Sequence, residues 1–213
     1  MPIRYVYTPM DKPPFYKEEP VGFKWNGGFA VSQKQKNIHA IHEGFKEQFP
    51  DKNVLEISSA SIQGGKVLSA FFLEKYVPSL GISIPVENLY QAGKVFENGG
   101  PYLDLLTVQP IKAKRDERLQ TSGKLIGYTL EGMNFPLYPQ TLFYNFLYMN
   151  ALLEHPEKAT LLHDYDGFKD IAFNPKKGIN CQARAAASFC ALAKLELLGA
   201  ILEFSNFKSL YVD

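Results

Sequence analysis

Three polar side chains recur at helical spacing in the segment VENLYQAGKVFENGG, residues 86–100. Glu87, Gln91 and Lys94 stand at i, i+4 and i+7, so a helix would place a carboxylate, an amide and an amine on one side. Glutamate can act as a general acid or base, and a lysine whose pKa is lowered by burial can form an imine with an aldehyde. This set suits the cleavage of an N-glycosidic bond, because the anomeric carbon of a sugar is a masked aldehyde. The alternative is solvated surface charge, with Gln91 as polar filler.

Two further segments offer groups that could contact a ligand. WNGGF contains the only tryptophan, and Trp25 is either a core residue or a platform on which a base stacks. The glycine pair beside it marks a plain turn or a place where the backbone approaches a ligand. LSAFFL offers the hydroxyl of Ser69 among apolar residues and is most simply a buried strand.

The segment GFKDIAFNPKKGINCQAR places amide and carboxylate side chains between aromatic residues and the start of a helix. Asp170, Asn174 and Asn180 are its candidate ligand-binding residues. Asn180 is either an ordinary N-cap or part of a helix N-terminus that holds a phosphate, with Lys176 and Lys177 nearby.

The elements that must position these groups are read from hydrophobic periodicity and breakers. They predict an α+β fold, dominated by helices with a small sheet, in one compact domain over residues 1–213. PQTLFYNFLYMNALLEHP is apolar nearly all round and should be a central buried helix. The other expected elements are strands at 3–7, 53–58 and 124–130, helices at 32–49, from 86 and at 180–199, and a final strand at 201–212.

Composition narrows the class of protein. The 213 residues are 46% hydrophobic and 14% aromatic, which describes a packed globule, and the net charge of +1 provides no broad field for DNA or membranes. No apolar run is long enough to span a membrane, and the N-terminus has no signal-peptide pattern. Cys181 and Cys190 are nine residues apart in an expected helix and point to opposite sides, so we expect no disulfide and a reducing, cytoplasmic compartment.

Motifs for metals and common cofactors are missing from the sequence. His39 and His42 share a helix, but no third ligand has a convincing spacing, and there is no HExxH, CxxC, P-loop, GxGxxG or GxSxG motif. We therefore expect no metal site and no cofactor.

Several of these segments, in order along most of the chain, resemble the NADAR family, and in particular the NADAR antitoxins that accompany DarT-type DNA ADP-ribosyltransferase toxins. VENLYQAGKVF is similar to the family's most specific motif, EHxYQAxK, with Asn88 in place of the usual histidine. VLSAFFL resembles its LSNF element. LYMNALLEHPEKATLLHDYDGFKDIAFNP and NCQARAAASFCAL resemble its later helices, although FNP stands where the family usually has WG.

The resemblance implies a pocket for ADP-ribose and the removal of ADP-ribose from guanine bases in DNA. Glu87 and Lys94 then become the catalytic candidates: Glu87 moves a proton, and Lys94 traps the opened ribose C1′ as an imine. Trp25 or Phe71 would stack on a base, while backbone N–H groups near the pyrophosphate would come from the glycine pair and the Asn180 helix start. The full set of substrate-binding candidates is Trp25, Asn26, Gly27, Gly28, Ser69, Phe71, Gln91, Asp170, Asn174 and Asn180.

Two other functions remain open at this point. The same domain could cleave a small N-glycoside, a nucleotide or riboflavin-pathway intermediate, or it could be a protein antitoxin that binds and blocks its toxin without catalysis. The expected partners are ADP-ribosylated DNA or ADP-ribose and a DarT-type toxin, with no membrane. The charge run Lys112, Lys114, Arg115 and Arg118 is either a DNA-facing patch or a solvated loop.

Overall fold

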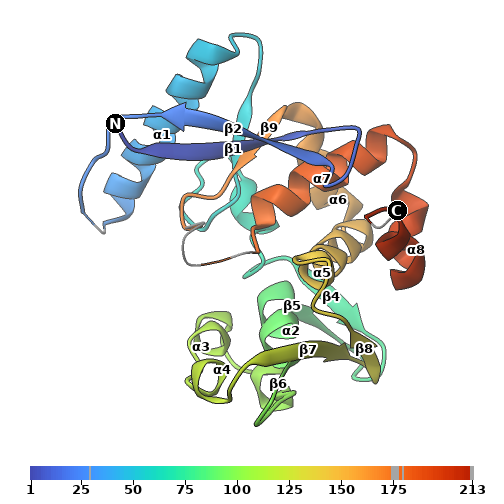
Figure 1. Ribbon diagram of the computed structural model, residues 1–213. Helices are drawn as coiled ribbons and strands as arrows, with labels where there is room; N and C mark the ends of the chain where they lie inside the picture. The colour runs from blue at the N-terminus through green and yellow to red at the C-terminus, as the bar shows by residue number, and fades with distance from the viewer. Residues whose placement is uncertain (29, 174–177, 179, 212–213) are drawn as a thin grey trace.

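A four-stranded mixed sheet forms the upper part of the molecule in Figure 1. The computed structural model describes residues 1–28, 30–173, 178 and 180–211. The sheet has the order β2-β1-β9-β3, with β9 antiparallel to β1 and parallel to β3. Its strands are β1 (Ile3–Pro9), β2 (Tyr16–Gly22), β9 (Gly167–Lys169) and β3 (Val54–Glu56).

Helices cover the two faces of this sheet because side chains alternate along β1. Val6 belongs to a cluster with Ile41 and Phe45 of α1 (Val31–Gln48), whereas Tyr7 belongs to the main core on the side of α7 (Gln182–Lys194). Alanines make up much of the buried face of α7, which allows that helix to lie close to β1 and β9.

The helix α5 (Leu142–Glu154) lies at the centre of the molecule. All its residues from Leu142 to Leu152 are buried, which confirms the central helix predicted from sequence. It contacts α7 on one side and the short helix α2 (Val86–Ala92) on the other. Because α5 bridges the two, it fixes the position of the segment that carries the candidate acid.

A second group of small elements forms the lower part of the molecule in Figure 1. A hairpin precedes α2, and a three-stranded antiparallel sheet of order β6-β7-β8 follows it. These elements are β4 (Glu74–Val77), β5 (Ile82–Pro85), β6 (Lys94–Phe96), β7 (Leu125–Leu130), β8 (Met133–Phe135), α3 (Pro110–Lys114) and α4 (Arg118–Thr121). Further on lie α6 (Pro156–Ala159) and α8 (Phe204–Ser209).

The C-terminal segment differs from the sequence prediction. Residues 201–212 were expected to form a strand, but the structure has a 3-10 turn, η4 (Leu198–Leu202), and then α8. Phe204 and Phe207, three residues apart, both pack on Phe146 of α5, so the apolar contacts follow a helical period. The α+β class itself is confirmed.

Cys181 and Cys190 are both buried and free, as expected from their spacing. Within the described residues, no helix is long and apolar enough to cross a membrane.

Candidate active site

The helix α2 carries the candidate acid and ends earlier than its sequence pattern predicts. Gly93 caps it, because the Gly93 carbonyl accepts a hydrogen bond from the backbone N–H of Thr129, 2.7 Å away in β7. A Cβ on Gly93 would lie 2.6 Å from the Thr129 carbonyl oxygen, so only glycine allows this approach. Lys94 therefore begins β6 and is not on the same helix as Glu87 and Gln91.

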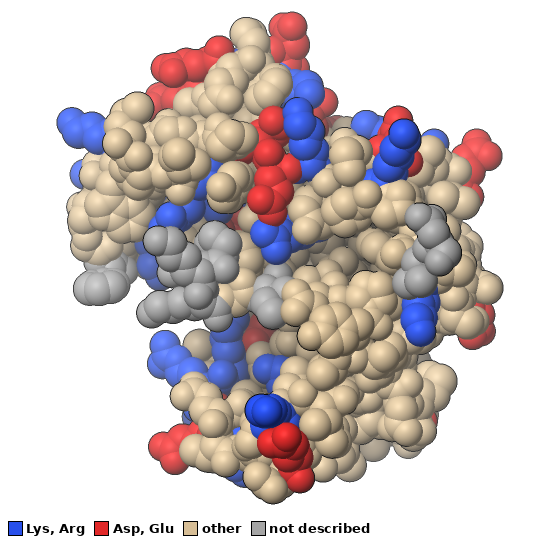
Figure 2. All heavy atoms as spheres, in the orientation of Figure 1, with Lys and Arg blue, Asp and Glu red and all other residues tan. Residues whose placement is uncertain are grey.

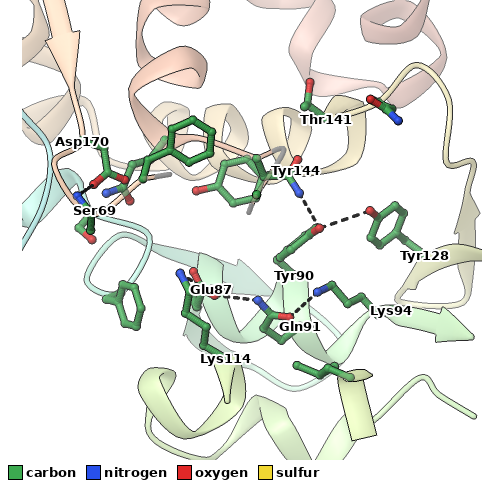
Figure 3. A pocket seen from close by; sticks show the side chains of 18 of the residues that line it. Ser69, Glu87, Tyr90, Gln91, Lys94, Lys114, Tyr128, Thr141, Tyr144 and Asp170 are labelled. Atoms are coloured by element: carbon green, nitrogen blue, oxygen red, sulfur yellow. Dashed lines mark hydrogen bonds and ion pairs between the residues drawn. The ribbon is translucent and has the colours of Figure 1, made fainter. Parts of the chain in front are cut away.

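The side chain of Lys94 nevertheless returns to the helix. Its Nζ donates a hydrogen bond to Gln91 Oε1 (2.6 Å), and Gln91 Nε2 donates one to Glu87 Oε1 (2.8 Å). Figure 3 shows this row, which we call the pocket cluster: Glu87, Gln91 and Lys94. A carboxylate and an amine are thus joined through one amide, as the sequence spacing suggested, although the backbone route differs.

A second lysine, Lys114, and the ring of Tyr90 lie next to the charged groups of the pocket cluster. Lys114 Nζ lies 3.6 Å from Glu87 Oε1, and Lys94 Nζ lies 4.7 Å from the centre of the Tyr90 ring. Burial lowers the pKa of Lys94 to about 8, the attraction of Glu87 opposes this change, and the cation of Lys114 adds to it. A larger share of Lys94 is therefore the neutral, nucleophilic amine near neutral pH.

The pocket cluster faces a cavity of about 720 Å³, a size typical of small-molecule sites. In Figure 3, Ser69 and Asp170 lie at one side, Lys94 and Tyr128 at the other, and Glu87 between them. Of the residues predicted from sequence, the cavity wall brings together Glu87, Lys94, Gln91, Ser69, Phe71, Asp170 and Asn180.

Ser69 and Phe71 reach the wall from a turn and not from the strand that their apolar surroundings suggested. The turn follows a 3-10 helix, η1 (Gly65–Leu68), and the backbone N–H of Phe72 donates to the Ser69 carbonyl (2.8 Å). On the same wall, burial raises the pKa of Asp170, whose Oδ1 accepts the N–H of Ala172 (2.9 Å).

A group of tyrosines lines the cavity and was missed by the sequence reading. The Tyr90 and Tyr128 hydroxyls are 3.3 Å apart, and Asn180 Nδ2 donates to the Tyr90 hydroxyl (2.5 Å). Tyr144, from α5, also lines the cavity. Tyr90 lies three residues after Glu87, which is a signal that could have been used. Tyr128 and Tyr144 come from elements whose place beside α2 depends on long-range packing.

The loop that contains Trp25 lies apart from this wall. The described cavity lining does not include Trp25, Asn26, Gly27 or Gly28. Trp25 is 50% exposed and packs edge-on against Phe23. The backbone N–H of Asn26 donates to Asn37 Oδ1 (2.7 Å), and Asn37 Nδ2 donates to the Asn26 carbonyl (2.9 Å), so the loop is fastened to α1.

Asn174 and Asn180 are the remaining candidates from the sequence. Asn174, with Lys176 and Lys177, lies outside the described residues. Asn180 Oδ1 is buried and has no hydrogen-bond partner among the residues described. Among those residues, no group of His, Cys, Asp and Glu side chains could hold a metal ion.

Asn88, which replaces the histidine of the motif that the sequence resembles, has a structural place. It is fully buried, and its Nδ2 donates to the carbonyls of Leu105 (2.7 Å) and Val108 (2.8 Å). These bonds hold the segment that leads into α3, the helix from which Lys114 reaches Glu87. Asn88 therefore helps to position α3, and with it Lys114, relative to α2.

Comparison with known proteins agrees with the sequence resemblance. A family model described as "DarT1-associated NADAR antitoxin" matches residues 2–213. A search of curated proteins gives no match to the chain. Because the family model covers nearly the whole sequence, this chain belongs to the DarT1-associated NADAR antitoxins.

Proposed function

We propose that this antitoxin is a glycohydrolase that removes ADP-ribose from guanine bases of DNA and so reverses the modification made by a DarT-type toxin. The site would be formed within one NADAR-like domain over residues 1–213. Three observations support the proposal: the family, the size of the cavity, and the acid and amine on its wall.

The single observation that carries the proposal is the position of Lys94. Its Nζ faces a cavity large enough for a nucleotide-sized ligand, burial lowers its pKa to about 8, and Gln91 links it to Glu87. An amine with these properties is suited to attack a sugar C1′ and to leave it again.

The first step opens the ribose. Glu87 gives a proton to the ring oxygen, the bond between C1′ and that oxygen breaks, and the lone pair of the base nitrogen holds C1′ as an iminium. The neutral Lys94 amine adds to C1′ and loses a proton to the Glu87 carboxylate. The base then takes this proton and departs, which leaves an imine between Lys94 and C1′.

Water completes the cycle by adding to the imine carbon. The C1′–Nζ bond breaks, Lys94 regains its amine, and the proton released from the water and the imine returns to the Glu87 carboxylate. ADP-ribose leaves with its aldehyde free to close the ring again. The net reaction consumes one water and yields ADP-ribose and the unmodified base. Asp170 and Ser69, across the cavity from Lys94, would bind ribose hydroxyls, and Asn180 Oδ1, which has no partner among the described residues, would accept a hydrogen bond from the ligand.

The test is a Lys94→Ala variant assayed on an oligonucleotide that carries ADP-ribosylated guanine. We expect at least about a thousandfold loss of turnover with unchanged folding, and borohydride should trap the wild-type protein as a covalent adduct at Lys94. Lys46→Ala, which removes an exposed lysine of α1, is the matched control and should retain full activity. Full activity of the Lys94 variant, or no adduct in the wild type, would refute the imine step.

The two alternative functions make different predictions in the same assays. A small-molecule N-glycosidase would cleave free nucleotides or riboflavin-pathway intermediates faster than modified DNA. A purely binding antitoxin would still protect cells when both Glu87 and Lys94 are replaced. We expect DNA to be the better substrate and the doubly substituted protein to give no protection.

A further inference from the structure

Two segments beside the cavity carry positive charge without any negative charge. Residues 57–73 and 105–115 together contain Lys66, Lys112, Lys114 and Arg115, and neither contains Asp or Glu. The chain as a whole has a net charge of only +1, so these four cations are a local concentration. We call these four residues, with Phe71 and Phe72, the basic rim.

The basic rim is continuous with the candidate active site. Ser58, Ser69 and Phe71 from the first segment and Lys114 from the second all line the cavity. Figure 2 shows the surface hollowed between the upper part of the molecule and the region of α3 and α4, with Lys and Arg side chains along the lower side of the hollow. A polymer with one nucleotide in the cavity would therefore cross this rim.

Each of two successive aromatic residues of the rim lies against a lysine. Lys114 Nζ is 5.1 Å from the centre of the Phe71 ring, and Lys66 Nζ is 4.8 Å from that of Phe72. Phe71 lines the cavity, whereas Phe72 is 44% exposed, so the two pairs lead from the cavity to the surface. Aromatic faces beside cations are the combination that binds the bases and phosphates of a single strand.

Three of the four charges of the rim are available to a ligand, since only Lys114 pairs with a carboxylate of a described residue, that of Glu87. Among the described residues, Lys66, Lys112 and Arg115 make no ion pair with a carboxylate, and all three are exposed. Arg118 differs, because Asp104 and Asp116 hold its guanidinium at 2.6 Å and 2.8 Å. The DNA-facing patch suggested by the charge run therefore loses Arg118 and gains Lys66, from a segment that the run does not include.

We infer that the basic rim binds the nucleotides that flank the modified base, and that it binds them as single-stranded DNA. This inference rests on the proposed function for the identity of the polymer. A duplex would hide the faces of its bases from Phe72, whereas unpaired bases can stack there while the phosphates lie against the cations. The cavity then recognises the ADP-ribosyl group, and the basic rim binds the DNA strand on either side of it.

The test compares two substrates and two pairs of substitutions. The substrates are an ADP-ribosylated single-stranded oligonucleotide and the ADP-ribosylated guanosine monomer. The first variant combines Lys66→Ala with Phe72→Ala, and the second combines Lys112→Ala with Arg115→Ala; none of these residues lines the cavity. Lys34→Ala with Lys36→Ala, on the exposed side of α1, removes two positive charges and is the charge-matched control for the second variant.

The rim variants should raise KM for the oligonucleotide about tenfold and leave kcat and the monomer reaction unchanged. The Lys112 and Arg115 variant should also flatten the log–log dependence of affinity on salt by about 1.4, because two phosphate contacts are lost. Unchanged oligonucleotide KM, or equal losses on both substrates, would overturn the inference.

A direct binding measurement separates the rim from the chemistry. Fluorescence anisotropy with an unmodified single strand should show binding by the wild type and about tenfold weaker binding by either rim variant. Equal binding of a duplex of the same sequence would overturn the inference. If the wild type binds the strand through the basic rim but cleaves neither modified substrate, the proposed glycohydrolase function is refuted and the inference that the rim binds single-stranded DNA is retained.

Discussion

Glu87 with the half-buried Lys94 and Glu56 with Lys169 are two pairs of acid and amine side chains withdrawn from bulk solvent, and of these two pairs the first faces the cavity. In the pocket cluster, Glu87 and Lys94 are linked through a side chain, Gln91. The other pair, which we call the sheet pair, is Glu56 at the end of β3 and Lys169 at the end of β9.

Glu56 and Lys169 form hydrogen bonds with backbone groups, whereas Glu87 and Lys94 form hydrogen bonds with the side chain of Gln91 and face the cavity. Lys169 Nζ donates to the Asp170 carbonyl (2.6 Å), and Glu56 Oε1 accepts the N–H of Ile171 (2.8 Å). The parallel strands place Glu56 and Lys169 in direct register, and neither lines the cavity. The two pairs therefore have the same residue types and differ in their hydrogen-bond partners and in their access to the cavity.

Replacing Glu by Gln in the pocket cluster and in the sheet pair should give the largest difference in turnover between the two. Glu87→Gln keeps the size of the side chain and removes its ability to exchange a proton, so turnover of ADP-ribosylated DNA should fall by roughly 10²–10⁴-fold. The melting temperature should change little, because Gln can still accept the bond from Gln91. Turnover and thermal unfolding, measured on one preparation, check this; a wild-type rate would remove the acid–base role.

The matched control is Glu56→Gln, which should leave turnover unchanged. Burial raises the pKa of Glu56 from 4.5 to about 8, against the attraction of Lys169. Between these values the unfolded chain releases a proton that the folded chain keeps, so the free energy of unfolding falls as pH rises from about 4.5 to about 8. The variant should show a flatter dependence in denaturant titrations across this range, and a loss of turnover would contradict the assignment of the pair as structural.

Removal of the amide that joins the pocket cluster should have an intermediate effect. Gln91→Leu deletes the acceptor of the Lys94 ammonium, and loss of a hydrogen bond to the charged form lowers the pKa of Lys94 further below about 8. We expect about a tenfold loss of kcat and a shift of the rising limb of the pH–rate profile to lower pH.

Lys114→Met should shift the rising limb of the pH–rate profile to higher pH, because the Lys114 cation lowers the pKa of Lys94. Shifts of the same sign in both variants would show that Lys94 does not set the limb.

The sequence predicted the contents of the pocket cluster but not its backbone. Spacing alone placed Glu87, Gln91 and Lys94 together, yet the helix ends at Ala92 because β7, about thirty residues later, pairs with Lys94–Phe96. A local pattern cannot reveal a strand partner that far along the chain. The side chain of Lys94 is long enough to return to Gln91, so the three side chains lie together as predicted although the secondary structure was predicted wrongly.

The tyrosines of the cavity wall were not predicted from the sequence at all. Tyr128 and Tyr144 come from β7 and α5, and their place beside Tyr90 follows from packing among three elements. The final segment illustrates a different error, since β-branched and aromatic residues favoured a strand while the spacing of Phe204 and Phe207 suited a helix.

Trp25→Ala should have the smallest effect on kinetics among the substitutions of candidate site residues. It tests whether an aromatic residue contributes to substrate binding through its position on the cavity wall or through its residue type. Its ring is half exposed beside Phe23, away from the cavity wall, so Trp25→Ala should change KM and kcat for modified DNA by less than about twofold. Phe71→Ala, on the wall, should raise KM about tenfold if a base stacks there. The measurement is steady-state kinetics on one modified oligonucleotide with both variants. A larger effect at Trp25 than at Phe71 would restore the base-stacking role that the sequence suggested for the tryptophan, and it would place part of the substrate over the loop held by Asn37.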